Sequence, residues 1–545
     1  MENAEYLAGE AMLAQACRTN GTADLAGLDD RTVRAEVIEQ LLLAPDAADL
    51  PVRGIRLANA LVTGPLRLNG AQVNCPLVFD GCDFYELPEF RDAQLLSLAM
   101  PGCHVPGLDA EGLQVHGSLR LQGSTRLGRR FVSTGQLSLL GARIGGTLYL
   151  RDADLSTPDE PKDVYPLNAS RLQVAHHFSC TSTRVDGQLR MINAKVGGVV
   201  NFRGTTIRRP GKLCLQAERL EVGESIWFGN KFTAEGRVLL NYARVGGTVD
   251  LAGARLLAPE QLTESEGPAA GTISLRALGI RIGRDLLVTK GFHAEGGLEL
   301  TSAKVTGKLS FRGAEKCGSG ERIELSGVSA GTMELLFTNR PSGELNLRNA
   351  HTELLVDDPR SWPEMIILDG FKYGRLQPES DVSIAQRLDM VRRGMQGYLP
   401  QPYEQLATVY RSAGQEQEAR RVAMAKERAR RSRLGLPGRA WGVVLQATVG
   451  YGYRTWLAGL WLLGLTVVGA VAFGHGQATP IVDRPPPFQD VVYTLDLLLP
   501  IADLGQEKAW QLGGALQWLT WTYVIAGWVL TTAVIAGLTR ALNRS

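Results

Sequence analysis

One pattern of residues recurs through the middle of the chain, from residue 51 to about residue 350. In its regular form a small residue is followed two positions later by Val or Ile, then by a glycine, and then by two apolar residues at alternate positions. This alternation indicates short β-strands, and the glycine indicates either a corner of the backbone or a close approach between neighbouring turns. The clearest copies lie at residues 142–150, 194–202, 243–251 and 303–311.

The spacing of the copies predicts how they pack. Copies begin at residues 172, 194, 220 and 243, and again at 280 and 303, so they recur every 22 to 26 residues. Repeats of this length are typical of solenoids. One turn cannot bury its own Leu and Val side chains, so stacked turns share one core while the Arg, Lys, Asn, Asp and Gln residues between them face water. We therefore predict a mainly β fold with a parallel β-solenoid at residues 51–350. An antiparallel sandwich is the weaker alternative, because it does not require the same corner in every repeat.

Helical segments flank the repeats. Residues 1–50 predict a helical cap, because a helix packed on the first turn would cover the open end of the solenoid. The repeat fades after about residue 350, and residues 351–440 predict a helical adaptor. Within the adaptor, residues 402–432 predict a helical hairpin with an apolar seam, which is similar to a single tetratricopeptide unit.

Two long apolar segments follow near the C-terminus. Residues 455–474 and residues 512–539 contain no charged side chain. A bilayer core about 30 Å thick needs about 20 apolar residues in a helix. We therefore predict that residues 441–545 form a two-helix transmembrane hairpin.

Charged residues around the apolar segments predict an orientation. Basic residues precede the first segment and follow the second, whereas the connection between them is acidic. Since positive residues remain in the cytoplasm, we expect a multi-pass membrane protein with both termini in the cytoplasm. The basic residues also predict attraction to anionic lipid at that surface, and a solvated helix face is the plainer alternative. No aromatic residues are interleaved with them, so we expect no nucleic acid. These basic residues are Arg420, Arg421, Lys426, Arg428, Arg430, Arg431, Arg433 and Arg439.

The connection between the apolar segments is itself partly apolar. Residues 488–499 are helix-like, and a loop containing proline follows them. This arrangement resembles the helix, pore loop and helix of two-transmembrane ion channels, although the filter glycines are missing. The resemblance implies a cation path lined by acidic side chains if the segment re-enters the membrane; on the outer surface the same acids would be solvated. The predicted pore-loop residues are Asp496, Pro500, Asp503 and Gly505.

Catalytic and cofactor motifs are missing from the sequence. The seven cysteines are odd in number and have neither CxxC spacing nor a zinc-type pairing, which predicts small buried thiols in a reducing compartment. The chain has no strand–GxGxxG–helix unit, no CxxCH haem motif and no Walker A motif. We therefore expect no cofactor, no metal site and no enzymatic activity.

The repeats described above resemble those of bacterial β-solenoids of the pentapeptide-repeat and bactofilin type, although the strict five-residue repeat is absent. The order of a solenoid, a basic helical segment and two apolar segments also resembles a bacterial family often labelled membrane-associated oxidoreductase. That label implies a redox activity, for which no residue of this sequence provides a motif.

The sequence features together predict a non-catalytic scaffold or assembly module. We expect it to be anchored on the cytoplasmic face of the inner membrane, with an unidentified protein partner on the solenoid. Self-association into a homo-oligomer is also expected, because glycines in the apolar segments allow helices to approach closely. An oligomeric ion channel with a solenoid sensor is the first alternative, and the redox enzyme of the family label is the second. The glycines in question are Gly459, Gly464, Gly469, Gly527 and Gly537.

Overall fold

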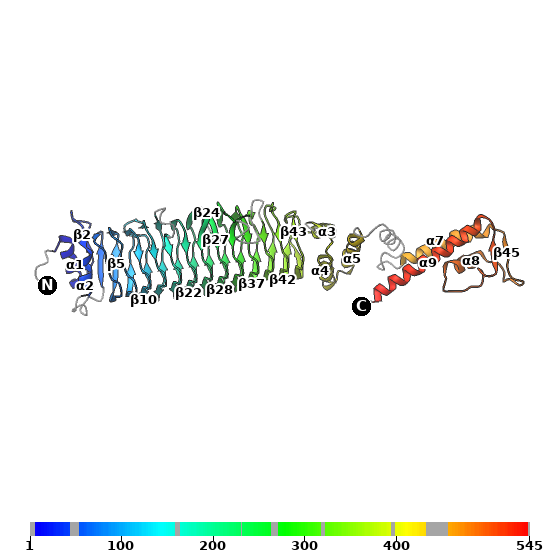
Figure 1. Cartoon of the computed structure of the whole chain (residues 1–545), viewed down its shortest axis with the longest axis horizontal. Helices are drawn as coiled ribbons and strands as arrows, with labels where there is room; N and C mark the ends of the chain where they lie inside the picture. The colour runs from blue at the N-terminus through cyan, green and yellow to red at the C-terminus, as the bar shows by residue number, and fades with distance from the viewer. Residues whose placement is uncertain are drawn as a thin grey trace. The chain divides into compact units, whose positions relative to one another are not determined.

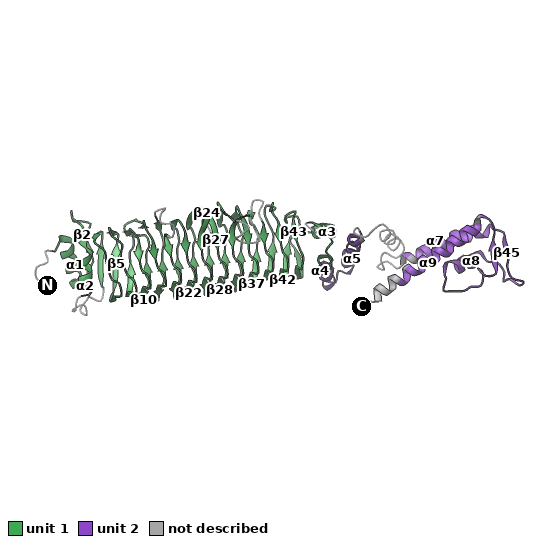
Figure 2. Ribbon diagram, viewed as in Figure 1, with its two compact units in different colours: residues 1–405 green, residues 406–545 purple. Residues whose placement is uncertain are grey.

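The computed structural model of the chain contains two compact units, residues 1–405 and residues 406–545 (Figure 2). Strands are the main regular element of the first unit, and helices are that of the second. The structure describes residues 6–43, 54–157, 164–229, 231–262, 271–317, 322–393, 398–431 and 456–542.

The first unit is a parallel β-solenoid of about 13 turns (Figure 1). Its strands form two 22-stranded sheets, in which strands of successive turns pair side by side. Some turns contribute one longer strand, whereas several contribute two short strands to each sheet. For example, β10 (Gln114–Val115) and β11 (Leu119–Arg120) belong to the first sheet, and β12 (Phe131–Ser133) and β13 (Leu137–Ser138) to the second. The predicted mainly β fold with a parallel solenoid is confirmed.

The turns of the solenoid bend at residues in the left-handed conformation. Asn193, Arg219 and Tyr242 have φ angles of 55°, 54° and 57°, and each lies two residues before the next strand of the first sheet. The central glycines of the repeat lie at a second bend of each turn, between its two strands in the first sheet, and their φ angles are not left-handed. A Cβ atom on Gly198 or Gly247 would lie 2.8 Å from a carbonyl oxygen of the preceding turn. The structure therefore fits both interpretations of the central glycine, a corner of the backbone and a close approach between turns.

In the core, similar apolar side chains at equivalent positions of successive turns stack in rows. Val196 on β22 (Lys195–Val196), Val222 on β25 (Glu221–Val222) and Val245 on β28 (Arg244–Val245) are directly paired in successive turns and are buried. Because each strand places alternate side chains on opposite faces, the residue before each valine points outward. The outward-facing residues are therefore paired with their equivalents in successive turns in the same register as the buried valines.

All seven cysteines are buried and unpaired, as predicted. Burial raises the pKa of Cys180, Cys214 and Cys317 to about 12. These thiols are small apolar components of the core rather than reactive groups.

Helices cover the first turn of the solenoid. α1 (Ala8–Thr19) packs against β1 (Ala23–Asp24) and β3 (Ile55–Ala58), and α2 (Ala35–Leu43) buries its apolar face nearby. The fully buried Glu10 accepts hydrogen bonds from Arg34 Nε at 2.8 Å and Arg34 Nη2 at 2.7 Å. This pair ties α1 to the strand that precedes α2.

Helices also cover the last turn. Asp357, at the end of β42 (His351–Asp357), forms a buried ion pair with Arg387 on α3 (Ile384–Arg392). At the start of α4 (Gln401–Ser412), Gln401 Nε2 donates to the Phe371 carbonyl at 3.0 Å, and Gln405 Nε2 donates to the Tyr373 carbonyl at 2.7 Å. These side chains therefore bind main-chain carbonyl groups just before and within the final strand, β44 (Lys372–Pro378), at the edge of the sheet.

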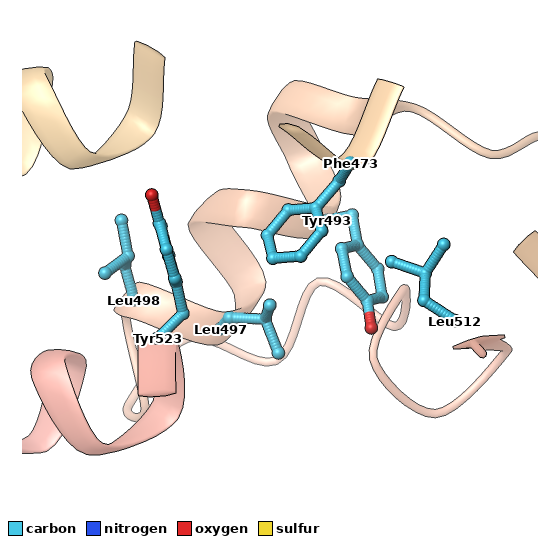
Figure 3. Close-up of a cluster of buried hydrophobic side chains, with 6 residues drawn as sticks. All are labelled: Phe473, Tyr493, Leu497, Leu498, Leu512 and Tyr523. Atoms are coloured by element: carbon cyan, nitrogen blue, oxygen red, sulfur yellow. The ribbon is translucent and has the colours of Figure 1, made fainter. Parts of the chain in front are cut away.

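The second unit is mainly helical. Its described elements after α5 (Glu416–Arg431) are α7 (Trp456–Gly474), β45 (Ala478–Pro480), α8 (Asp490–Leu498), β46 (Trp510–Leu512) and α9 (Ala515–Leu542). Figure 3 shows a buried cluster between α7, α8 and α9, in which the Phe473 ring meets those of Tyr493 and Tyr523 at centroid distances of 5.4 Å. The short α8 therefore packs against both long helices.

The predicted transmembrane hairpin is wrong. In the described ranges of the chain, no helix combines the length and the sustained apolarity needed to cross a membrane. Polar residues such as Gln517, Thr520 and Thr522 interrupt α9, and part of the apolar surface of α7 and α9 is used in the cluster around Phe473. The predictions that depended on the hairpin are corrected with it: the membrane and its anionic lipid as partners, and a multi-pass location in an inner membrane with cytoplasmic termini.

Two of the glycines proposed for helix association have a role within the chain. A Cβ on Gly469 would lie closer than 3.0 Å to Thr494 of α8, and a Cβ on Gly527 would lie 2.7 Å from the Leu498 carbonyl. Gly459 and Gly464 have no neighbouring atom within 4 Å of such a Cβ. The close approach at Gly469 and Gly527 is therefore between α8 and the helices beside it, and homo-oligomerisation remains a prediction.

Candidate binding groove on the solenoid

A row of outward side chains runs along one position of the first sheet. The strand residue that precedes each buried Val or Ile is paired with its equivalent in the turns before and after it, without a shift of register between β10 and β33 (Arg281–Ile282). Neighbouring positions are therefore separated by one strand spacing, about 4.8 Å. We call this row the outer ladder. Its members are Gln72, Gln94, Gln114, Arg143, Gln173, Lys195, Glu221, Arg244, Arg281, Lys304, Ser329, His351 and Lys372.

Cations dominate the central part of the outer ladder. Arg244, Arg281 and Lys304 stand on three consecutive turns and are exposed. In the described part of the chain none of the three forms an ion pair, whereas Lys195 pairs with Glu221 at 3.0 Å. Like charges on neighbouring strands are destabilising. On the ladder itself, Glu221 is the neighbour of Arg244 on one side and Ser329 is the neighbour of Lys304 on the other, so the repulsion within this run is only partly offset.

Cations elsewhere on the solenoid are more often neutralised. On the second sheet, Arg276 pairs with Glu299 at 2.9 Å. Near the last turns of the first sheet, Lys308 pairs with Glu334 at 3.0 Å, and Arg312 pairs with Glu379 at 2.7 Å. Cations without an ion pair also occur elsewhere among the described residues, for example Arg255 and Lys316 on the second sheet, but His293 stands between those two in the pairing of the strands. What distinguishes the outer ladder is that three such cations lie on consecutive paired strands.

A groove follows the outer ladder. One stretch of about 700 Å³ extends from Lys195 to Lys304, and a second stretch of about 430 Å³ extends from Gln114 to Lys195. The two stretches share Lys195, so together they follow successive turns along the surface. The Val and Ile residues between the ladder and the glycines also line this groove, although their side chains point into the core.

The glycines of the groove lie directly against main-chain carbonyl groups. A Cβ on Gly197, Gly223, Gly246 or Gly283 would lie closer than 3.0 Å to the carbonyl oxygen of the equivalent residue in the preceding turn. These oxygens belong to Ala175, Gly197, Gly223 and Gly246. The sequence therefore keeps this side of the groove free of side chains where the backbone needs the space.

Those four carbonyl oxygens accept no hydrogen bond from the described residues of the protein. The N–H groups of Gly197, Gly223, Gly246 and Gly283, in contrast, all donate to valine carbonyls of the preceding turn, at 2.8–2.9 Å. The groove thus presents cations along one side and a row of hydrogen-bond acceptors along the other. A ligand that fits it carries anionic groups and hydrogen-bond donors.

Asp496 of the predicted pore loop is buried and organises the loop that follows α8. Its carboxylate accepts hydrogen bonds from the backbone N–H groups of Leu504 at 2.7 Å, Gln506 at 2.8 Å and Glu507 at 2.8 Å. Three convergent N–H donors satisfy a buried carboxylate without any cation. The geometry is that of a structural loop anchor.

The other predicted pore residues lie on the surface of the same loop. Asp503 is exposed and pairs with Lys508, which lowers the pKa of Asp503. Gly505 has a φ of 76°, a conformation that favours glycine, and Pro500 lies in the turn after α8. The channel alternative required the membrane hairpin and is not retained.

Most of the predicted basic residues lie on α5. Arg420 forms an ion pair with Glu416 at 3.5 Å, and Arg430 lies 4.0 Å from Glu427, so two of the cations have acids on the same helix. Arg433 and Arg439 fall outside the described residues. The remaining predicted members on this helix are Arg421, Lys426, Arg428 and Arg431.

The described ranges contain no group of three His, Cys, Asp or Glu side chains placed to hold a metal ion. No protein-family model, no curated protein and no solved structure matches this chain. Fold and surface therefore define the class, a parallel β-solenoid with helical caps and a cation-lined groove. The resemblance to a named bacterial family stays a resemblance.

Sequence reasoning missed the outer ladder, although its signal is present in the repeat. Arg143, Lys195, Arg244 and Lys304 all stand between the small residue and the Val or Ile that define a copy. Recording which polar residue fills that one position in each copy would have revealed the cations. Their alignment in space follows because the pairing is in register throughout.

Proposed function

We propose that this protein is a non-catalytic scaffold that holds an extended anionic partner along the side of its solenoid. The run of Arg244, Arg281 and Lys304 on consecutive paired strands, beside a continuous groove, carries the proposal. A catalytic site needs different groups that converge on one point. A row of similar groups at a fixed spacing suits a partner that has a repeat of its own.

The caps support binding along the side rather than at the ends. α1 covers the first strands of the solenoid, and side chains from α3 and α4 bind the last turn. Covered ends are poor surfaces for stacking one solenoid on another, because the helical caps already cover the main-chain N–H and C=O groups at the edges of the sheets. The long sides of the solenoid remain as the surfaces where a partner binds.

The test is a binding titration of the full-length protein with four labelled polyanions: linear polyphosphate, poly-L-glutamate, single-stranded DNA and polygalacturonate. The ladder variant Arg244→Gln/Arg281→Gln/Lys304→Gln is compared with the charge-matched control Arg184→Gln/Arg255→Gln/Lys316→Gln on the second sheet. At about 1 kcal/mol per cation, the ladder variant should lose roughly 100-fold in affinity for at least one polyanion.

The control variant should keep the affinity of the native chain within a few-fold. Circular dichroism establishes that both variants retain the β-solenoid. Failure of all four polyanions to bind, or an equal loss in both variants, would overturn the proposal.

A further inference from the structure

We propose that the extended partner is an acidic polysaccharide, a chain of sugars that carries carboxylate groups at regular intervals. This inference rests on the proposed function, and it names the chemical class of the ligand. The argument depends on the row of carbonyl groups opposite the cations, because cations alone attract every polyanion.

The carbonyl oxygens of Ala175, Gly197, Gly223 and Gly246 form a row of acceptors that receive no hydrogen bond from the described protein. The N–H groups on the same side of the groove are all engaged in bonds between turns. A matching ligand must therefore supply donors as well as negative charge. Sugar hydroxyl groups are such donors and occur on every residue of a polysaccharide.

Other polyanions match this surface less well. The backbones of polyphosphate and DNA carry phosphate oxygens, which accept hydrogen bonds and donate none. Stacking on aromatic side chains usually supplements the electrostatic binding of single-stranded DNA, and no aromatic residue lines either stretch of the groove except His116. An extended acidic peptide presents side chains on one face about every 6.6–6.8 Å, which does not match a spacing of about 4.8 Å.

The order of charges along the outer ladder fits a polymer in which a charged sugar alternates with a neutral one. Arg143, Lys195, Arg244 and Lys304 stand on every second turn, about 10 Å apart. Between the first three of these cations the ladder carries Gln173, which is neutral, and Glu221, an acid that is ion-paired with Lys195, so the positive charge of Lys195 is partly offset. Arg281 departs from the alternation and adds a cation to the central run.

The groove predicts how affinity depends on the length of the ligand. From Gln114 to Lys304 it follows eight consecutive ladder positions, a span of about 34 Å at one strand spacing per step. Affinity should rise with chain length until the ligand fills that span and then level off. A single binding point would give no such dependence.

The experiment uses the full-length protein and oligosaccharides of alternating glucuronate and N-acetylglucosamine, in a series of defined lengths. Isothermal titration calorimetry compares them with carboxyl-reduced oligosaccharides of the same lengths, and with polyphosphate, single-stranded DNA and poly-L-glutamate of equal total charge. We expect the acidic oligosaccharides to bind at least 10-fold more tightly than the other polyanions. Carboxyl reduction and the ladder variant Arg244→Gln/Arg281→Gln/Lys304→Gln should each lower the affinity at least 10-fold, and the second-sheet control should not.

The outcomes separate this inference from the proposed function. If polyphosphate, DNA or poly-L-glutamate binds at least as tightly as the oligosaccharides and depends on the same three cations, the polysaccharide inference is overturned while the scaffold proposal stands. If no ligand in either series depends on those cations, both are overturned. Equal binding of acidic and carboxyl-reduced oligosaccharides overturns the role of the cations in recognition.

Discussion

Gly223 illustrates how single residues limit the surface of this solenoid. Its backbone is not left-handed, yet a Cβ would lie closer than 3.0 Å to the carbonyl oxygen of Gly197 in the preceding turn. The obstacle is backbone, which cannot rotate away as a side chain can. A substitution here must therefore either separate two turns or tilt the carbonyl group.

We expect Gly223→Ala to lower the free energy of unfolding of the solenoid by about 1–3 kcal/mol, the usual cost of overpacking. Gly27→Ala is the matched control, because nothing lies within 4 Å of a Cβ at that position. Urea denaturation followed by far-UV circular dichroism measures both. Equal midpoints for the two variants would contradict the close approach of the turns.

The two acids of the predicted pore loop should respond differently to substitution. Asp496→Ala removes the acceptor of three backbone N–H groups, so the loop after α8 should lose roughly 3 kcal/mol of stability. Asp503→Ala removes an exposed pair with Lys508 and should change little. Hydrogen exchange of the amides of Leu504, Gln506 and Glu507 reports the difference, and fast exchange in both variants would argue against Asp496 as the anchor.

At the scale of elements, the ion pair between Asp357 and Arg387 joins the last turn to α3. Both side chains are almost completely buried. Burial raises the pKa of Asp357, even though the hydrogen bond and charge of Arg387 act in the opposite direction. Burial thus disfavours the charged carboxylate, and Arg387 is the group that opposes this effect.

Removal of one partner should cost more than removal of both. We expect Arg387→Ala to lower the stability of the cap by about 3–5 kcal/mol, because it leaves a buried carboxylate without a cation. The double variant Asp357→Leu/Arg387→Met should lie close to the native chain. Thermal unfolding and limited proteolysis near α3 measure both, and a double variant as unstable as the single one would contradict this account.

At the scale of the whole molecule, the thiols distributed through the core make stability depend on pH in the alkaline range. Burial raises the pKa of Cys180, Cys214 and Cys317 from the ordinary value of 9.0 to about 12. The unfolded chain therefore releases these protons at lower pH than the folded chain does. Their contribution to stability is complete below about pH 9 and is lost as the pH rises toward 12.

We expect the unfolding free energy of the native chain to fall more steeply between pH 9 and pH 11 than that of Cys180→Ala. Other groups that titrate in this range contribute equally to both proteins, so the difference between the two slopes isolates the one thiol. Chemical denaturation at a series of pH values measures the slopes. Identical slopes would show that Cys180 does not titrate in the unfolding equilibrium.

Much of the fold could be predicted from the sequence because the same pattern of apolar residues occurs in many copies along the chain. The alternation around copies such as 194–202 and 243–251 predicted strands, and the period predicted stacked turns. The burial of all seven cysteines was also predicted. Each of these inferences depends on a residue and its neighbours along the chain.

The hairpin and the ladder show where such reasoning ends. A long run of apolar residues resembles a membrane segment when only its composition is considered. In the structure, however, Phe473, Tyr493 and Tyr523 pack against one another in one cluster. In the sequence, Asp496 resembles an acid that lines a pore. In the structure, three backbone N–H groups of the following loop donate to its carboxylate, and the sequence does not reveal the fold of that loop. These outcomes depend on contacts between segments.

The sequence by itself determined that this chain folds as a parallel β-solenoid, because stacked turns bury its alternating apolar residues and also account for the same corner at each period, which a sandwich does not require. Only the tertiary structure decided what the surface presents. Parallel pairing in register aligns Arg244, Arg281 and Lys304, which are far apart in the chain, in one row at strand spacing. The same pairing engages the glycine N–H groups and leaves the carbonyl groups beside them free. A binding groove arises from that register because hydrogen bonds between turns fix where every outward side chain lies.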